Sequence, residues 1–238
     1  MPRAEPPRAC PSLRGPLIRS SRIDRPWWRI HRAGRDARSF RDTGAEDKRA
    51  DPRTHGTEGR FDCQAGEYGY LYLGAARHTA IAEAFLRGPV IADPTARVVR
   101  ASKASGMAVT RLRRSVALPL VDLRSAEGLG RVGQDAWLTT TDEADYPLTQ
   151  RWATSIRAWA PGAAGMIWMS RRDPAEEAAI LFADRTPDVA LVVEHVRALD
   201  DPVGFALLQA TLSRFTVDLD GGARPGMERA RRSRTLRT

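Results

Sequence analysis

Five polar side chains are of the types that could bind an anionic ligand and cleave a bond beside it. A guanidinium group offers several coplanar donors to phosphate oxygens, and a carboxylate stabilises positive charge that develops during a reaction. The five are Arg29, Arg60, Tyr72, Glu83 and Ser170. Each stands at or near a predicted strand end, or in the loop or helix beyond it, where ligands are usually bound.

The strand that carries Arg29 is predicted by the alternation of bulky and basic side chains over residues 27–32. A period of two places Arg29 on the same face as Trp27 and His31. Residues 33–58 are charged, have little apolar periodicity and predict a long loop. This loop contains further arginines that could replace Arg29 as a phosphate ligand, namely Arg41, Arg49 and Arg53.

Tyr72, Glu83 and Ser170 lie on elements further along the chain. Residues 70–73 predict a strand, residues 77–87 predict a helix with Glu83 at the border of its apolar face, and Ser170 ends a short apolar strand. The same patterns predict strands at 96–100, 107–113, 118–123, 179–182 and 189–195, and helices at 146–160 and 204–215. Because strands and helices mix without strict alternation, the sequence predicts an α+β fold with a mixed β-sheet flanked by helices.

The net charge of +9 resides in two arginine-rich ends. Residues 1–25 carry a net charge of +4 and residues 221–238 a net charge of +5, so the middle of the chain is neutral. We expect a disordered basic extension over 1–25, a catalytic domain over 26–220 and a disordered Arg-rich tail over 221–238. Such ends bind phosphate backbones without sequence specificity, so weak nucleic-acid binding through them is the main alternative function.

Cysteine usage and hydropathy favour a cytoplasmic protein. Cys10 and Cys63 form neither an even disulfide framework nor a zinc motif. No apolar run approaches the roughly 20 residues that span a bilayer, and the N-terminus lacks the features of a secretory signal. The four histidines show no metal-ligand spacing, so we expect no metal and no membrane association. The sequence leaves open whether the chain forms a homo-oligomer.

A glycine-rich segment at residues 128–133 imitates a dinucleotide-binding loop. Its spacing matches G-x-G-x-x-G, which requires a strand immediately before it, a helix after it and an acidic residue about 20 positions on. Here the preceding strand ends too early, residues 137–140 predict a strand, and position 153 is alanine. We therefore interpret the segment as a glycine-rich turn.

In their order along the chain, the five candidate residues resemble the RES domain family, which is named for its characteristic Arg, Glu and Ser. The likeness covers roughly residues 26–215. No single piece of it is specific, but the order and spacing of the pieces together are. The pieces are residues 28–32, 59–62, 71–73, 80–83, 165–172 and 180–182.

The resemblance implies the toxin of a toxin–antitoxin pair, with a fold similar to that of ADP-ribosyltransferases. RES proteins destroy NAD by hydrolysing or phosphorolysing its nicotinamide–ribose bond, and a cognate antitoxin with an Xre-like DNA-binding region neutralises them. The resemblance therefore implies NAD as substrate, phosphate as co-substrate in the phosphorolytic case, and no cofactor. The sequence does not decide between water and phosphate, and an ADP-ribosyltransferase-like enzyme is a further alternative.

Cleavage of the nicotinamide–ribose bond suits a site with a single carboxylate. Nicotinamide leaves as a neutral molecule, so no acid has to protonate it, whereas ordinary glycosidases usually need two carboxylates. Positive charge gathers at the ribose, where Glu83 would stabilise it. We expect catalytic roles for Glu83, Arg60 and Ser170. We expect NAD-binding roles for Arg29 and Arg60 at the pyrophosphate, for Tyr72 at the nicotinamide riboside, and for Ser170 at the ribose or a phosphate.

Each of these residues also has a purely structural interpretation. Glu83 could pair with Arg87 one helical turn on, an interaction worth only a few tenths of a kcal/mol. Arg29 could be a surface residue of an edge strand, Tyr72 a core residue, and Ser170 a turn former at a strand end. Taken one at a time the structural interpretations are favoured, whereas the ordered set favours the functional one.

Overall fold

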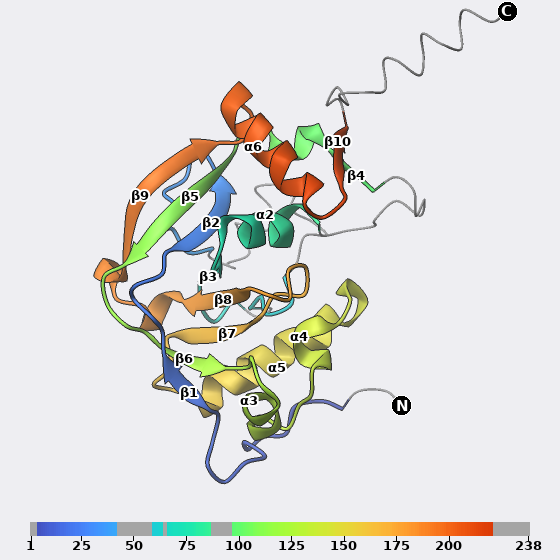
Figure 1. Ribbon diagram of the computed structural model, residues 1–238. Coiled ribbons are helices and arrows are strands. Elements are labelled where there is room, and N and C mark those ends of the chain that lie inside the picture. The colour runs from blue at the N-terminus through green and yellow to red at the C-terminus, as the bar shows by residue number, and fades with distance from the viewer. Residues whose placement is uncertain (1–3, 42–58, 64–65, 87–96, 221–238) are drawn as a thin grey trace, which may run out of the picture.

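The computed structural model describes residues 4–41, 59–63, 66–86 and 97–220, which form an eight-stranded mixed sheet and a two-stranded sheet (Figure 1). The strand order in the large sheet is β1-β6-β7-β8-β3-β2-β5-β9, and only β6 and β7 run parallel. Its strands are β1 (Ile18–Ser20), β2 (Trp27–Arg32), β3 (Tyr70–Gly74), β5 (Met107–Arg114), β6 (Pro119–Asp122), β7 (Gly165–Met169), β8 (Glu177–Phe182) and β9 (Leu191–Ala198). In the small sheet, β4 (Val98–Arg100) pairs with β10 (Asp218–Asp220). The predicted α+β fold with a mixed sheet is confirmed.

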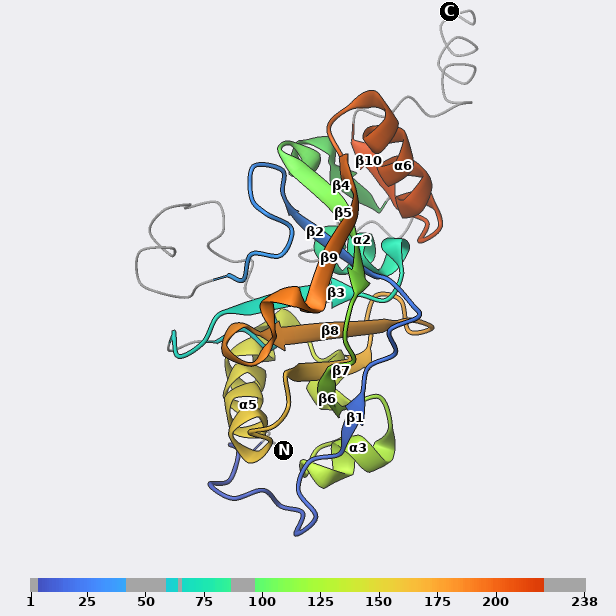
Figure 2. The same cartoon turned by 90° about the vertical axis from the view of Figure 1, so that its left-hand side faces the viewer.

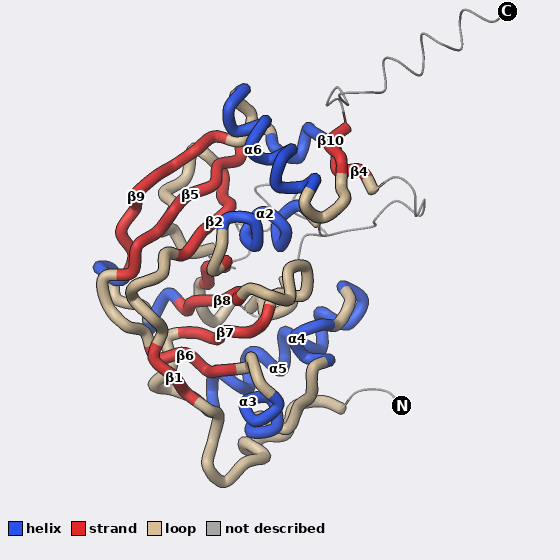
Figure 3. Tube along the Cα trace, in the orientation of Figure 1, coloured by secondary structure: helices blue, strands red, loops and turns tan. Residues whose placement is uncertain are grey.

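The α-helices of the described residues lie on one side of the large sheet (Figures 1 and 3). They are α2 (Arg77–Phe85), α3 (Ala126–Arg131), α4 (Trp137–Thr140), α5 (Tyr146–Trp159) and α6 (Pro202–Ser213). Short 3-10 helices occur at Ala101–Ala104, Glu143–Asp145, Ala183–Arg185 and Asp188–Ala190. The α2 and α6 helices cover one half of the sheet, and α3, α4 and α5 lie by the other half.

Alternation along β3 divides the core between the two faces of the sheet. Tyr70 and Tyr72 belong to the cluster beneath α5, whereas Leu71 and Leu73 belong to a cluster on the opposite face. Burial of each large apolar side chain contributes about 1.5–3 kcal/mol, which fixes the register of the strand. The face that carries Tyr72 is therefore the face that the helices cover.

The two halves of the sheet meet at a narrow junction between β2 and β3. A single residue pair, Trp28 with Gly74, joins these strands. In Figure 2, β2, β5 and β9 run across the direction of β3, β7 and β8. A Cβ at Gly74 would lie 2.6 Å from the backbone nitrogen of Ala80, so glycine lets α2 begin directly over the end of β3.

The N-terminal segment corrects the expectation of a disordered extension over residues 1–25. From residue 4 it follows a defined path beside α5 and then forms β1, which pairs with β6 (Figure 1). The carbonyl of Ala4 accepts a hydrogen bond from Trp152 Nε1 (3.1 Å), and Glu5 forms an ion pair with Arg151 (2.7 Å). The prolines exclude a helix, but an extended chain can still pack on the α5 surface. Residues 221–238, the expected tail, lie outside the described residues.

The glycine-rich segment at 128–133 overlaps the helix α3, where the sequence predicted a turn. Ser125 caps the helix by accepting a hydrogen bond from the backbone N–H of Gly128 (3.1 Å). A Cβ at Gly128 would lie 1.8 Å from the carbonyl oxygen of Asp122. Glycine is therefore required because the helix starts against the end of β6.

Residues 137–140 form the helix α4, so the strand that the sequence predicted there is wrong. The carboxylate of Asp135 accepts a hydrogen bond from the backbone N–H of Trp137 (2.8 Å) and stabilises the first turn. Local capping thus outweighs the strand preference of the two threonines in this segment.

From the sequence we expected no membrane span, no metal site and no disulfide, and the observations on these three features apply only to the residues that the structure describes. Among them, no helix is long and apolar enough to cross a membrane. The same ranges contain no group of three or more His, Cys, Asp or Glu side chains that could hold a metal ion. Cys10 and Cys63 are both free thiols.

Candidate functional site

Arg60 lies in a tight turn that is attached to β3. The hydroxyl oxygen of Tyr72 accepts a hydrogen bond from the backbone N–H of Phe61 (2.9 Å), and the carboxylate of Asp62 accepts one from the N–H of Gly59 (2.8 Å). A Cβ at Gly59 would lie 2.6 Å from the Tyr72 hydroxyl oxygen. The close approach explains why glycine and aspartate flank the Arg-Phe pair.

The α5 helix supports the same turn from the other side. The hydroxyl of Thr149 donates to the carbonyl of Arg60 (2.6 Å), and the side-chain amide of Gln150 donates to the carbonyl of Gly59 (2.9 Å). Thr149 and Gln150 are both fully buried. Neither residue was predicted from the sequence, although two adjacent polar residues within a helix that carries an apolar stripe indicate a buried polar contact.

The guanidinium group of Arg60 is buried, with 5% of the residue exposed. Its Nη2 donates to the carbonyl of Thr141 (3.2 Å), and the group lies 5.5 Å from the ring centroid of Tyr146. The same carbonyl accepts a hydrogen bond from Nη1 of Arg171 (2.7 Å). One backbone carbonyl therefore connects the Arg60 turn with the segment that begins at Ser170.

Ser170 and Glu83 are joined directly. The Ser170 hydroxyl donates to Oε1 of Glu83 (2.6 Å) and accepts hydrogen bonds from the backbone N–H groups of Arg172 (3.2 Å) and Asp173 (3.1 Å). Because a hydroxyl has one proton and two lone pairs, these bonds use its full capacity. Ser170 is also only 1% exposed. This geometry favours a role in orienting Glu83 over the expected direct contact with a ribose or phosphate.

The alternative partner of Glu83, Arg87, lies outside the described residues. Glu83 itself is partly exposed on α2 and is held by the Ser170 hydroxyl. A carboxylate fixed by a buried hydrogen bond yet accessible from one side can approach a ligand in a defined orientation.

Tyr72 lies on the same face of the sheet as Ser170. Its half-buried ring contacts the ring of Trp168 edge-on, with centroids 6.2 Å apart. Trp168 and Ser170 are two residues apart at the end of β7, and their side chains therefore point to the same face. The described contacts thus connect Arg60, Tyr72, Glu83 and Ser170 into one group.

Arg29 is not part of this group. The pairing of Trp28 with Gly74 turns Trp28 toward the helices, so Arg29 lies on the opposite face with Trp27, as the period of two predicted. Its Nη1 donates to the carbonyl of Ala37 (2.6 Å). Burial lowers the pKa of the Arg29 guanidinium to about 10, which leaves it charged at neutral pH. Its assignment as an NAD ligand stays a prediction, and these contacts do not link it to the other four residues.

Arg41 is the loop arginine that lies beside the candidate site. Its backbone pairs with that of Tyr70 on β3, and its Nη1 lies 3.8 Å from a carboxylate oxygen of Asp62. Its side chain is 35% exposed. Arg41 is therefore better placed than Arg29 to contact an anion near Arg60. The other two loop candidates, Arg49 and Arg53, lie outside the described residues.

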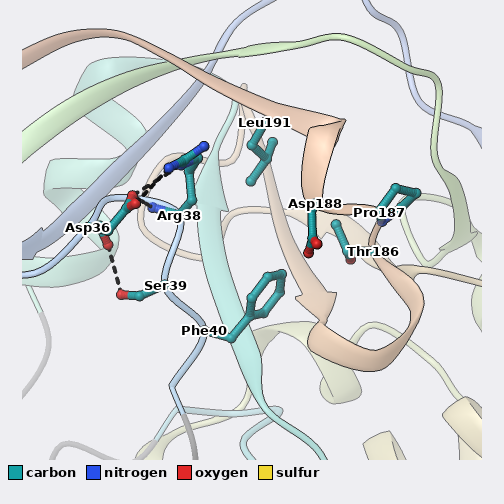
Figure 4. Close-up of a pocket in the computed structure, with 8 residues that line it drawn as sticks. All are labelled: Asp36, Arg38, Ser39, Phe40, Thr186, Pro187, Asp188 and Leu191. Carbon is teal, nitrogen blue, oxygen red and sulfur yellow. Dashed lines mark hydrogen bonds and ion pairs between the residues drawn. The ribbon is translucent and has the colours of Figure 1, made fainter.

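A pocket of about 310 Å³ opens on the face that carries Arg29 (Figure 4). Its lining residues are Asp36, Arg38, Ser39, Phe40, Thr186, Pro187, Asp188 and Leu191. Hydrogen bonds from Arg38 hold the pKa of the Asp36 carboxyl at about 2. Because this pocket and Glu83 lie on opposite faces of the sheet, we do not assign it to the candidate site.

Comparisons with known proteins bear on the family and the fold of the chain. A family model described as RES domain matches residues 26–223. No curated protein matches the chain. Among solved structures, a chain of the crystal structure of the M. tuberculosis MbcT-MbcA toxin-antitoxin complex is similar, with a TM-score of 0.57 and 20% sequence identity. The match covers 83% of this chain and 93% of that chain, and at this identity it shows a shared fold.

Proposed function

The chain belongs to the RES domain family, and from this premise we propose that it is the toxin of a toxin–antitoxin pair and cleaves the nicotinamide–ribose bond of NAD. The observation that carries the proposal is the Glu83 carboxylate, held by the buried Ser170 hydroxyl in the same connected group as Arg60 and Tyr72. The fold shared with a chain of a toxin–antitoxin complex supports an antitoxin as the partner.

The proposed reaction needs one carboxylate. As the bond between the ribose C1″ and the nicotinamide nitrogen breaks, its electron pair leaves with neutral nicotinamide, and positive charge develops on the ribose. Glu83 stabilises that charge. Water then adds to C1″ and loses a proton to give ADP-ribose, or inorganic phosphate adds to give ADP-ribose 1″-phosphate. Ser170 keeps the carboxylate oriented toward the ribose.

Positive charge for the pyrophosphate comes from Arg60, with Arg41 as the accessible second arginine. A guanidinium that is shielded from water interacts strongly with an anion because its field is poorly screened. Tyr72 supports the Arg60 turn, and its half-buried ring packs against Trp168 on the same face. The proposed location of the reaction is the cytoplasm, where NAD is abundant and thiols stay reduced.

Ion pairs in the N-terminal segment weaken the alternative function, which is nucleic-acid binding through the arginine-rich ends. Arg22 pairs with Asp24 (2.7 Å), Arg19 with Asp122 (3.3 Å), and Arg25 with Glu176 (3.7 Å). Arginines that are already paired with carboxylates contribute less to phosphate binding. The alternative therefore depends mainly on residues 221–238.

The decisive assay incubates the purified protein with NAD, with and without phosphate, and measures nicotinamide and the mass of the sugar product. Nicotinamide release only with phosphate identifies phosphorolysis, and release in both buffers identifies hydrolysis. ADP-ribose attached to protein would instead identify an ADP-ribosyltransferase-like enzyme. No nicotinamide release in either buffer would contradict the NAD-cleaving function.

The toxin role needs a test in cells. Expression of the wild-type chain in a bacterial host is expected to lower cellular NAD and stop growth, whereas the Glu83→Gln variant at equal abundance should allow growth. Growth arrest without a fall in NAD would point to a different target. Rescue by a co-expressed neighbouring antitoxin gene would identify the partner.

Arg60→Lys is expected to raise the KM for NAD about 10-fold, because lysine keeps the charge but loses the planar donors that match a pyrophosphate. The kcat should change less than the KM. The measurement is the initial rate of nicotinamide release over a range of NAD concentrations.

Arg114→Lys is a matched control for that variant. Arg114 is likewise 5% exposed, and its guanidinium lies 4.1 Å from the ring centroid of Trp27, on the other face of the sheet. Both substitutions should lower the melting temperature, but only the one at Arg60 should raise the KM. Equal KM values in the two variants would assign Arg60 a purely structural role.

A further inference from the structure

The turn that carries Ser170 has a second attachment to α2. Oδ2 of Asp173 accepts a hydrogen bond from the hydroxyl of Thr79 (2.6 Å) and lies 3.2 Å from Nε2 of His78. Asp173 also donates its backbone N–H to the Ser170 hydroxyl (3.1 Å). Asp173 therefore contacts both α2 and the hydroxyl that orients Glu83.

The Ser170–Glu83 and Thr79–Asp173 hydrogen bonds lie side by side and together attach the turn to α2. Thr79 and Glu83 are four residues apart and lie on the same side of α2. Ser170 and Asp173 lie three residues apart on the turn, so two side-chain bonds join the turn and the helix side by side. Thr79 and Ser170 are 0% and 1% exposed. Water has little access to such buried groups and cannot replace a lost partner. Loss of either hydrogen bond therefore lowers the stability of the contact between the turn and α2.

The backbone of the turn that contains Asp173 also sets where the Ser170 proton points. The backbone N–H groups of Arg172 and Asp173 occupy the acceptor side of the Ser170 oxygen, which leaves its proton for Glu83. A turn released from Thr79 would move these N–H groups, and the Ser170 hydroxyl could then rotate away. Glu83 would regain rotamers in which its carboxylate no longer faces the ribose, and small misplacements of a catalytic group lower rates strongly.

We propose that Asp173 is a positioning residue, which acts through Thr79 and the Ser170 turn to hold the Glu83 carboxylate in its catalytic orientation. This inference rests on the proposed NAD-cleaving function. The role of Asp173 differs from that of a purely structural side chain, because replacement of Asp173 should lower kcat while the affinity for the substrate stays unchanged.

The test compares Thr79→Val, which removes the hydroxyl at nearly constant volume, with Thr79→Ser, which retains it. Thr79→Val and Asp173→Ala are each expected to lower the kcat for nicotinamide release about 10-fold, with the KM for NAD within about 2-fold of wild type. Thr79→Ser should keep most of the kcat. The double variant should be no slower than the slower single variant, because Asp173→Ala already removes the hydrogen bond that Thr79→Val removes.

Thr186→Val is the matched control. The Thr186 hydroxyl is also buried and donates to the carbonyl of Phe182 (2.8 Å), away from α2. This variant should lower the melting temperature without changing kcat. An equal kcat in Thr79→Val and wild type would overturn the proposal, as would additive losses in the double variant.

Hydrogen exchange separates this inference from the proposed function. The backbone amides of residues 172 and 173 are expected to exchange at least about 10-fold faster in Thr79→Val than in wild type, and at the wild-type rate in Thr186→Val. If the wild-type protein releases no nicotinamide, the NAD-cleaving function fails, and the positional role of Asp173 with it. If exchange is unchanged in Thr79→Val, the attachment does not hold the turn, whatever the activity.

Discussion

The Glu83→Gln variant is expected to lower the kcat for nicotinamide release from NAD by about 10²- to 10³-fold. Glutamine has nearly the same shape as glutamate but no negative charge, so the developing charge on the ribose loses its stabilising partner. The Ser170 hydroxyl can still donate to the amide oxygen, so the turn and the helix should remain in place. The melting temperature should therefore change by no more than about 2 °C.

Glu127→Gln is the control for that experiment. Glu127 lies on α3, and its exposed carboxylate pairs with Arg131 (2.9 Å), an interaction worth well under 1 kcal/mol. Its removal should leave both the rate and the melting temperature unchanged. If Glu83→Gln released nicotinamide as fast as Glu127→Gln, the role of the carboxylate would be wrong even if NAD were still cleaved.

Elements that bury one face were predictable from the sequence alone. The period of two over β2 and the apolar stripe of α5 each reflect a local pattern that packing preserves. The glycine-rich segment was not predictable in this way. Gly128 is needed because α3 approaches the carbonyl of Asp122, a contact that no local pattern contains.

For the candidate site, too, local patterns were predictable from the sequence and contacts between distant segments were not. Arg60 and Glu83 could be found because Arg60 lies in the segment that leads to β3 and Glu83 lies at the border of the apolar face of α2, and the family resemblance supplied their order. The period of two correctly predicted which residues of β2 share a face with Arg29. It could not predict which of the two faces lies toward α2, because that is set by the pairing of β2 with β3. Partners such as Thr79 and Asp173 are 94 residues apart and become visible only in the folded chain.

Deletion of residues 1–21 is expected to lower the free energy of unfolding by about 3–5 kcal/mol and to cause aggregation. Trp152 is 3% exposed and would lose its contact with Ala4, and the edge of β6 would lose β1. An unpaired strand edge is a template for association with other chains. Denaturant unfolding and light scattering measure both effects.

Deletion of residues 221–238 is the comparison, because it removes six arginines from beyond the last described strand, whereas deletion of residues 1–21 removes four. It should change the free energy of unfolding by less than about 0.5 kcal/mol and leave nicotinamide release intact. Only this deletion can test the nucleic-acid alternative, since removal of the N-terminal segment damages the fold itself. Equal stability of the two truncated proteins would mean that the contacts of the N-terminal segment with α5 and β6 contribute little in solution.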